Sequence, residues 1–198
     1  MTRYVYIPFP SAEMDQMASA WEAGRRNENK EPPTFIRKRT SLTKIFSPQQ
    51  RRNQLGMIQP DDKLYVMAHG NRDAISANID GGKSYDPATL ARKLEERGLP
   101  KNCKDVRIFA CNSADGDADS FADRLKAQMQ QRGYSEVQVC GYHGEVYPQY
   151  GKRYNSQLDR ISGLHKGAEF DTTPSDISDN AAVAGKTMRA SNRRRRVP

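Results

Sequence analysis

The stretch "LYVMAHGN", residues 64–71, joins an apolar run to a histidine and a glycine. A second stretch, "VRIFACNS" at residues 106–113, has the same form with a cysteine in the place of the histidine. Short apolar runs that end in turn-forming residues are typical of buried β-strands. The two stretches therefore predict a pair of strands, with His69 just past the end of one and Cys111 just past the end of the other.

Strand and helix patterns alternate around these two stretches. Apolar and β-branched runs predict strands, while apolar residues at helical spacing predict helices. We expect strands at 3–7, 63–68, 106–110 and 136–141, a hairpin closing at 81–82, and helices at about 11–24, 87–97 and 117–131. Such alternation predicts an α/β fold whose mostly parallel central sheet carries helices on both faces.

Prolines, charge and weak patterning set the domain boundaries. Pro32 and Pro33 lie in a charged stretch that is typical of a linker rather than of a helix or strand. The expected units are an N-terminal strand and helix of the core at 1–24, a linker or arm at 25–47, the main domain at 48–165 and a disordered basic tail at 166–198. Within the main domain, residues 154–164 are a candidate edge strand or hairpin.

Composition narrows the classes of protein to consider. The net charge is +8, and the basic residues cluster at 25–30, 37–44, 51–52 and 193–196. Clusters of this kind attract polyanions. The three cysteines show no C-x-x-C spacing, which argues against a disulfide framework or a structural zinc site and favours a reducing compartment. No apolar run is long enough for a membrane span or a standard signal peptide.

The predicted strand ends carry the chemistry of a nucleophilic site. Parallel strands present their carboxyl ends at one edge of the sheet, where the active sites of such folds form. Cys111 can serve as a nucleophile and His69 as its base. The backbone N–H groups of Gly70 and Cys111 can form an oxyanion hole. We also expect the helix that follows Cys111 to favour the thiolate through its N-terminal dipole.

Simpler interpretations compete with this one. A cysteine at a strand end is commonly a small buried hydrophobe, and a histidine beside glycine is commonly a turn residue. The matched positions of His69 and Cys111 favour a shared site over two separate core roles. Cys140 and His143, in "VQVCGYHG", form a rival pair at the end of the third strand. Cys103 precedes its strand and is expected to be structural.

The two stretches resemble the signature of the caspase-like cysteine peptidases of clan CD. The segments "IDGGKSYDPATLARKLEERGLP" and "SFADRLKAQMQQRGYSEVQVCGYHGEV" are most similar to the self-cleaving cysteine protease domains of multifunctional RTX toxins and large clostridial toxins. The resemblance covers about residues 60–147. It implies a caspase-like three-layer sandwich, with 48–165 as the peptidase domain. It also implies a His69–Cys111 dyad, with Gly70 stabilising the oxyanion.

The same resemblance implies an activator and a place of action. Toxin domains of this kind are switched on by inositol hexakisphosphate in the host cytosol. The candidates for binding it are basic residues, namely Arg51, Arg52, Lys152 and Arg153. We expect a protein substrate, which could be the chain itself, and a bacterial effector or toxin that is exported without a standard signal peptide. We expect neither a membrane span nor a nucleic-acid partner.

Two other functions stay open at this point. A caspase-like module without catalysis could use its basic segments to bind polyanions or a protein partner. A relative of the CHAT peptidases, another branch of the clan, would use the same His-Gly and Cys positions without inositol phosphate.

Overall fold

The computed structural model describes residues 1–27, 29–37, 53–78, 81–147, 167–168, 188–189 and 194–198. Its centre is a six-stranded sheet in the order β12-β8-β7-β3-β1-β2. The bounds of these strands are β1 Arg3–Ile7, β2 Thr34–Arg37, β3 Lys63–Met67, β7 Asp105–Phe109, β8 Gln138–Tyr142 and β12 Arg194–Arg196. Every neighbouring pair is parallel except β12 with β8. The prediction of a mixed α/β fold with a mostly parallel sheet is confirmed.

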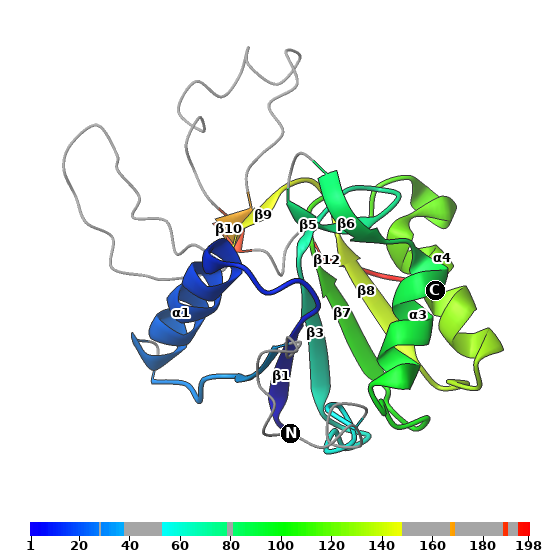
Figure 1. Cartoon of the computed structure of the whole chain (residues 1–198), viewed down its shortest axis with the longest axis horizontal. Helices are drawn as coiled ribbons and strands as arrows, with labels where there is room; N and C mark the ends of the chain where they lie inside the picture. The colour runs from blue at the N-terminus through cyan, green and yellow to red at the C-terminus, as the bar shows by residue number, and fades with distance from the viewer. Residues whose placement is uncertain (28, 38–52, 79–80, 148–166, 169–187, 190–193) are drawn as a thin grey trace, which may run out of the picture.

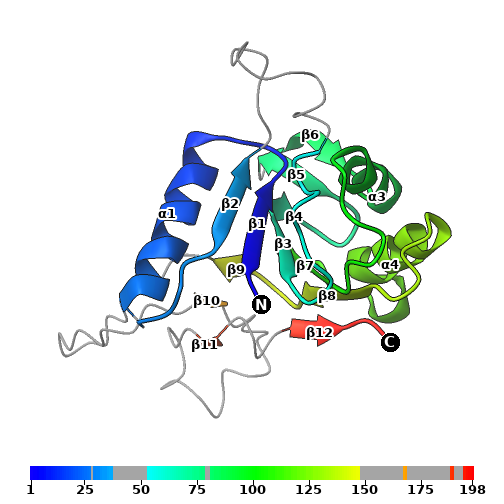
Figure 2. The same cartoon turned by 90° about the horizontal axis from the view of Figure 1, so that it is seen from below.

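Helices cover both faces of this sheet, as Figures 1 and 2 show. Helix α1 (Ala12–Asn27) lies on one face, and α3 (Pro87–Glu96) and α4 (Phe121–Gln131) lie side by side on the other. On the α1 face, the Trp21 ring packs against Tyr65 at 5.0 Å and Phe109 at 5.1 Å between centroids. The opposite face holds a larger apolar cluster built around α3 and α4. The sheet is therefore the middle of three layers.

Shorter elements extend from the ends of the parallel strands. An antiparallel sheet is formed by β4 (His69–Gly70), β5 (Ile75–Asn78) and β6 (Gly81–Tyr85), so the expected hairpin is present, but Gly81 and Gly82 belong to β6 and do not form its turn. A second small sheet contains β9 (Val146–Tyr147), β10 (Gly167–Ala168) and β11 (Met188–Arg189). A single 3₁₀ turn, η1 (Asp117–Asp119), precedes α4.

Local capping explains where the helices begin. The Ser11 hydroxyl accepts a hydrogen bond from the Met14 amide at 3.1 Å, and the Asp86 carboxylate accepts one from the Thr89 amide at 2.6 Å. Ser120 forms a capping box at the start of α4. That helix begins later than the sequence predicts because Gly116 adopts a positive φ of 99° and a 3₁₀ turn follows it.

The stretch predicted as a linker or arm at 25–47 contains more structure than expected. Helix α1 continues past Gly24 to Asn27, and residues 34–37 form β2, which pairs in parallel with β1 at the sheet edge. Burial of Ile36 gives this short strand an apolar anchor that Pro32 and Pro33 obscure in the sequence. Residues 38–52 and 154–164 lie outside the described residues.

The prediction of a disordered tail is wrong for residues 194–198. Strand β12 pairs with β8, and the Val197 amide donates to the Val139 carbonyl at 3.0 Å. Val197 is buried in the cluster beneath α3 and α4. The Arg195 guanidinium contacts both carboxylate oxygens of Asp123, at 2.9 and 3.1 Å. Composition alone missed this strand because its partners are distant in the sequence and its charged side chains suggested a solvated tail.

Candidate active site

The ends of β3 and β7 bring the His69 and Cys111 backbones to matched positions. The two strands are parallel neighbours, and their register joins residues 42 positions apart, up to Met67 with Phe109. His69 and Cys111 have the same separation and follow two residues later. The Ala68 amide still donates to the Phe109 carbonyl at 3.4 Å, so the strands remain adjacent at their ends. Neighbouring strands lie about 4.8 Å apart, which is close enough for the two side chains to meet.

Both side chains belong to the face of the sheet that α1 covers. Met67 and Phe109 pack in the apolar cluster of that face, and Cys111 packs partly buried against the same cluster. Because side chains alternate along a strand, His69 shares the face of Met67. Its contact with Glu13 of α1 agrees with this placement. The imidazole and the thiol are thus on one side of the sheet.

Gly70 lies directly against the backbone around Cys111. A Cβ at this position would be 2.8 Å from the Ala110 Cβ and 3.5 Å from the Cys111 carbonyl oxygen. The Asn71 amide bonds to the Ala74 carbonyl at 3.0 Å, so the next pair of the hairpin, Gly70 with Ile75, is of the non-hydrogen-bonded kind. The Gly70 N–H is therefore not used in the pairing with β5.

The environment of Cys111 differs from the expectation of a helix-stabilised thiolate. Burial raises the pKa of the Cys111 thiol, and the nearby Glu145 carboxylate raises it further; the Val146 backbone and the Cys111 amide act in the opposite direction without reversing the shift. Sγ donates to the Val146 carbonyl oxygen at 3.8 Å. The first amides of α4 bond elsewhere, with Ala122 donating to the Ser113 carbonyl. A nucleophilic role for this thiol would therefore require a base to take its proton.

The His69 imidazole is buried, and Glu13 is its observed partner. Nε2 lies 3.1 Å from Oε2 of Glu13, whose side chain is half exposed in the first turn of α1. Sequence reasoning missed Glu13 because 56 residues separate it from His69. Its local pattern is that of any acidic residue near a helix N-terminus, so no signal in the sequence distinguished it.

The loop after Cys111 is fixed to β8 by several bonds. The Ser113 hydroxyl donates to the Ile108 carbonyl and accepts from the Tyr142 amide, both at 3.0 Å. The Asn112 amide donates to the Gly144 carbonyl at 2.8 Å, with Asn112 itself at a positive φ of 54°. These bonds hold the backbone that carries the thiol in one position.

The structure separates the rival pair. Cys140 lies within β8, between Arg107 on β7 and Arg196 on β12, and burial raises the pKa of its thiol. His143 follows the end of β8 and engages Asp115 instead, with Nδ1 at 2.8 Å from Oδ1. Cys103 is fully buried beneath α3 and α4, and burial raises the pKa of its thiol to about 11, in agreement with a structural role.

The predicted phosphate-binding residues Arg51, Arg52, Lys152 and Arg153 lie outside the described residues. Within the described part, several basic residues lie on strands of the central sheet, with Arg3 on β1, Lys63 on β3, Arg107 on β7 and Arg194 on β12. Burial lowers the pKa of Lys63, and the charges of Arg107, Arg3 and Arg194 act in the same direction, while the Asp105 carboxylate acts against them. Arg107 is neutralised by Asp105 at 2.6 Å.

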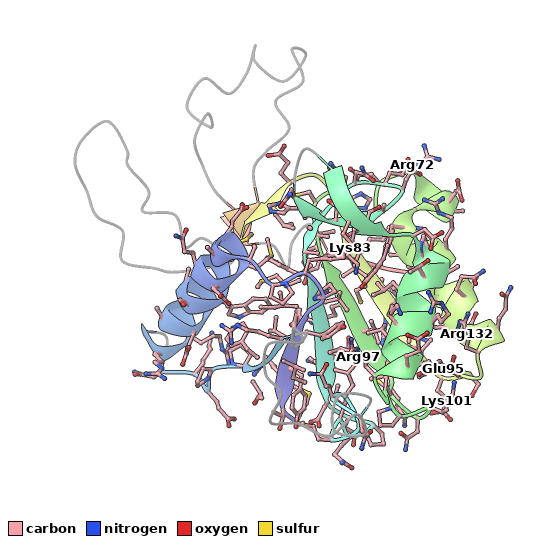
Figure 3. The ribbon with its side chains drawn as sticks, in the orientation of Figure 1. Arg72, Lys83, Glu95, Arg97, Lys101 and Arg132 are labelled. Carbon is pink, nitrogen blue, oxygen red and sulfur yellow. The ribbon has the colours of Figure 1, made fainter. Side chains whose placement is uncertain are left out.

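The cations on the α3 and α4 surface form ion pairs with carboxylates. Figure 3 shows Glu95 near Lys101 and Arg132, and both make ion pairs with it, at 2.5 and 2.9 Å. Arg72, labelled at the opposite end of this surface, pairs with Asp119 at 3.2 Å. These cations are therefore poorer candidates for an anionic ligand than Arg3 and Lys63.

Comparison with known proteins identifies a family whose function is unknown. A family model described as a domain of unknown function, DUF8616, matches residues 42–152, more than half of the 198 residues. No curated protein matches the chain. Among the helices in the described ranges, none has the length and apolar character needed to cross a bilayer. The matched segment contains both His69 and Cys111, and the chain belongs to the DUF8616 family.

Proposed function

We propose that the chain is a cysteine endopeptidase of the caspase-like type, with His69 and Cys111 as its catalytic dyad. The observation that supports this most strongly is the register of β3 and β7, which continues to matched positions for the two residues on one face of the sheet. Placement of α1 on one face, and of α3 and α4 on the other, is compatible with a caspase-like sandwich.

The proposed reaction is acyl transfer through a thioester. His69 removes the proton of the Cys111 thiol as sulfur attacks the carbonyl carbon of the scissile peptide bond. The Gly70 and Cys111 amides donate to the oxyanion that forms. His69 then returns the proton to the departing amine as the C–N bond breaks. Water, deprotonated by His69, hydrolyses the thioester and restores the free thiol.

A polyanionic activator is part of the proposal. Arg3 on β1 is in register with Lys63 at the start of β3, so these two cations are neighbours, and Arg194 lies three strands away on β12, opposite Tyr142. This charge supports inositol hexakisphosphate as the activator of a bacterial effector or toxin, exported without a standard signal peptide and acting on proteins in a host cytosol. The substrate could be another protein or the chain itself.

The decisive experiment is a mass-spectrometric search for cleavage by the full chain, with itself and a denatured protein mixture as substrates. The search is run with and without inositol hexakisphosphate. Cys111→Ala and His69→Ala should each abolish cleavage, while Cys140→Ala, which removes another buried thiol, should retain it. Cleavage by the Cys111→Ala protein would contradict the assignment.

Thermal melting measures activator binding separately from cleavage. A ligand present at 100 times its dissociation constant stabilises the folded state by about 2.7 kcal/mol, which appears as a higher melting temperature. The Arg3→Ala/Lys63→Ala variant should lose this shift. Lys101→Ala, whose charge is already paired with Glu95, should keep it. No shift in the wild type would remove inositol hexakisphosphate from the proposal and favour a peptidase of the CHAT type.

One observation favours a second function, a non-catalytic module that binds a polyanion or a protein partner. The Cys111 thiol is partly buried, its pKa is raised and it donates to the Val146 carbonyl. Alkylation by iodoacetamide separates the two functions. Preferential labelling of Cys111 that depends on His69 supports the peptidase, whereas equal and slow labelling of the three cysteines supports the binding module.

A further inference from the structure

We propose that Glu13 is a positioning residue that orients His69, so that Glu13, His69 and Cys111 act together. The contact that carries this inference is the 3.1 Å approach of the His69 Nε2 to the Glu13 Oε2. The His69 side chain is only 9% exposed, while the Glu13 side chain is 53% exposed, so a buried imidazole contacts a carboxylate that solvent can reach. The inference rests on the proposed peptidase function.

Helix α1 holds Glu13 firmly over the strand ends. The Ser11 cap fixes the start of the helix, and Met14, adjacent to Glu13, is buried in the cluster of the α1 face. Further along the helix, Trp21 is buried against the aromatic rings of β3 and β7. The carboxylate is thus carried by a packed element, which is the condition for orienting another side chain reproducibly.

The contact determines which nitrogen of His69 can act as the base. A carboxylate accepts hydrogen bonds, so the proton of the neutral imidazole resides on Nε2 and the lone pair on Nδ1. The proton of the Cys111 thiol then moves to Nδ1, leaving a thiolate and an imidazolium. The negative charge of Glu13 stabilises that imidazolium. Asp115, a carboxylate of the Cys111 loop, is engaged with His143.

Three variants test the inference. Glu13→Ala removes the acceptor, Glu13→Gln keeps an acceptor oxygen without the charge, and Asp15→Asn is the matched control. Asp15 lies on the same helix, is equally exposed at 53%, and pairs with Arg37 rather than with a histidine. Melting curves of all three establish that each protein is folded.

Two readouts are independent of peptide cleavage. ¹⁵N NMR of the imidazoles reports the tautomer of His69, and the iodoacetamide reaction rate reports the nucleophilicity of Cys111. We expect Glu13→Ala to lose the Nε2–H tautomer and to slow alkylation of Cys111 about tenfold, as for one charge-assisted hydrogen bond. Glu13→Gln should keep the tautomer and react at an intermediate rate, and Asp15→Asn should match the wild type.

The outcomes separate this inference from the peptidase proposal. A Glu13→Ala protein with the wild-type tautomer and an alkylation rate within about twofold of wild type would overturn the role of Glu13, even if the wild type cleaves proteins. Loss of the tautomer and of Cys111 reactivity in a chain that cleaves nothing would support the positioning role and defeat the peptidase proposal.

Discussion

Gly141 and Ser113 approach so closely that a Cβ on Gly141 would lie 2.7 Å from the Ser113 carbonyl oxygen. The other atoms that this Cβ would meet are also backbone, the Ser113 carbonyl carbon and the Ala114 nitrogen. Backbone held by hydrogen bonds cannot yield as the tip of a flexible side chain can. Strand β8 therefore needs a glycine here for the loop that carries Cys111 to close against it.

Gly141→Ala should destabilise the fold by about 1–3 kcal/mol and reduce the reactivity of Cys111, because the loop must shift to relieve the overlap. Urea unfolding and iodoacetamide labelling measure the two effects. Gly133→Ala is the comparison: its Cβ meets nothing within 4 Å, and only its positive φ of 89° carries a cost. Equal behaviour of the two variants would contradict the steric explanation.

Gly70→Ala should lower both stability and thiol reactivity, since its Cβ would lie 2.8 Å from the Ala110 Cβ. Ala110→Gly removes that neighbour and should recover part of the loss in the double variant. A double-mutant cycle on the free energy of unfolding measures the coupling, which we expect to exceed about 0.5 kcal/mol. Strict additivity would show that the two residues do not clash.

Alkaline pH should destabilise the protein partly through Cys103. Its thiol has a pKa of about 11, against an ordinary value of 9.0, because burial disfavours the thiolate. Above pH 9 the unfolded chain loses this proton first, so stability is lost as the pH rises from about 9 to about 11. The full effect is roughly 2–3 kcal/mol. Cys103→Ala should show a shallower decline over this range in urea unfolding, and an unchanged decline would refute the explanation.

Arg195→Ala should cost about 1–2 kcal/mol, because the guanidinium contacts both oxygens of the Asp123 carboxylate in a partly buried setting. Arg26→Ala breaks an exposed pair with Glu22 and should cost about 0.5 kcal/mol or less. Thermal melting compares the two. If the Arg195 variant is no less stable than the Arg26 variant, the tail strand is not anchored by this pair.

The strands and helices that the sequence predicted well are those whose signals are local. Apolar runs placed β3 and β7, and Asp86 with Pro87 placed the start of α3. Strands β2 and β12 were missed because each is stabilised by pairing with a distant strand at a sheet edge. Charge and proline near these segments pointed to linkers instead.

The candidate site was predictable only in part for the same reason. The repeated motif singled out His69 and Cys111, and the predicted parallel strands indicated the matched positions that the register of β3 and β7 gives them. Glu13 could not be found, since its contact exists only once α1 packs on the sheet. The thiolate expectation was wrong because α4 starts ten positions after Cys111, and its first amides bond to the Ser113 carbonyl and the Ser120 hydroxyl.

The outer strands of the sheet have a consequence for protein production. Residues 42–152, the part shared with the family, contain only β3, β7 and β8 of the six-stranded sheet. An excised fragment of that range would leave β3 and β8 with open hydrogen-bonding edges and would bare the apolar surface that α1 covers. Such a fragment is expected to aggregate on expression, so biochemical work on this chain should keep both flanking segments.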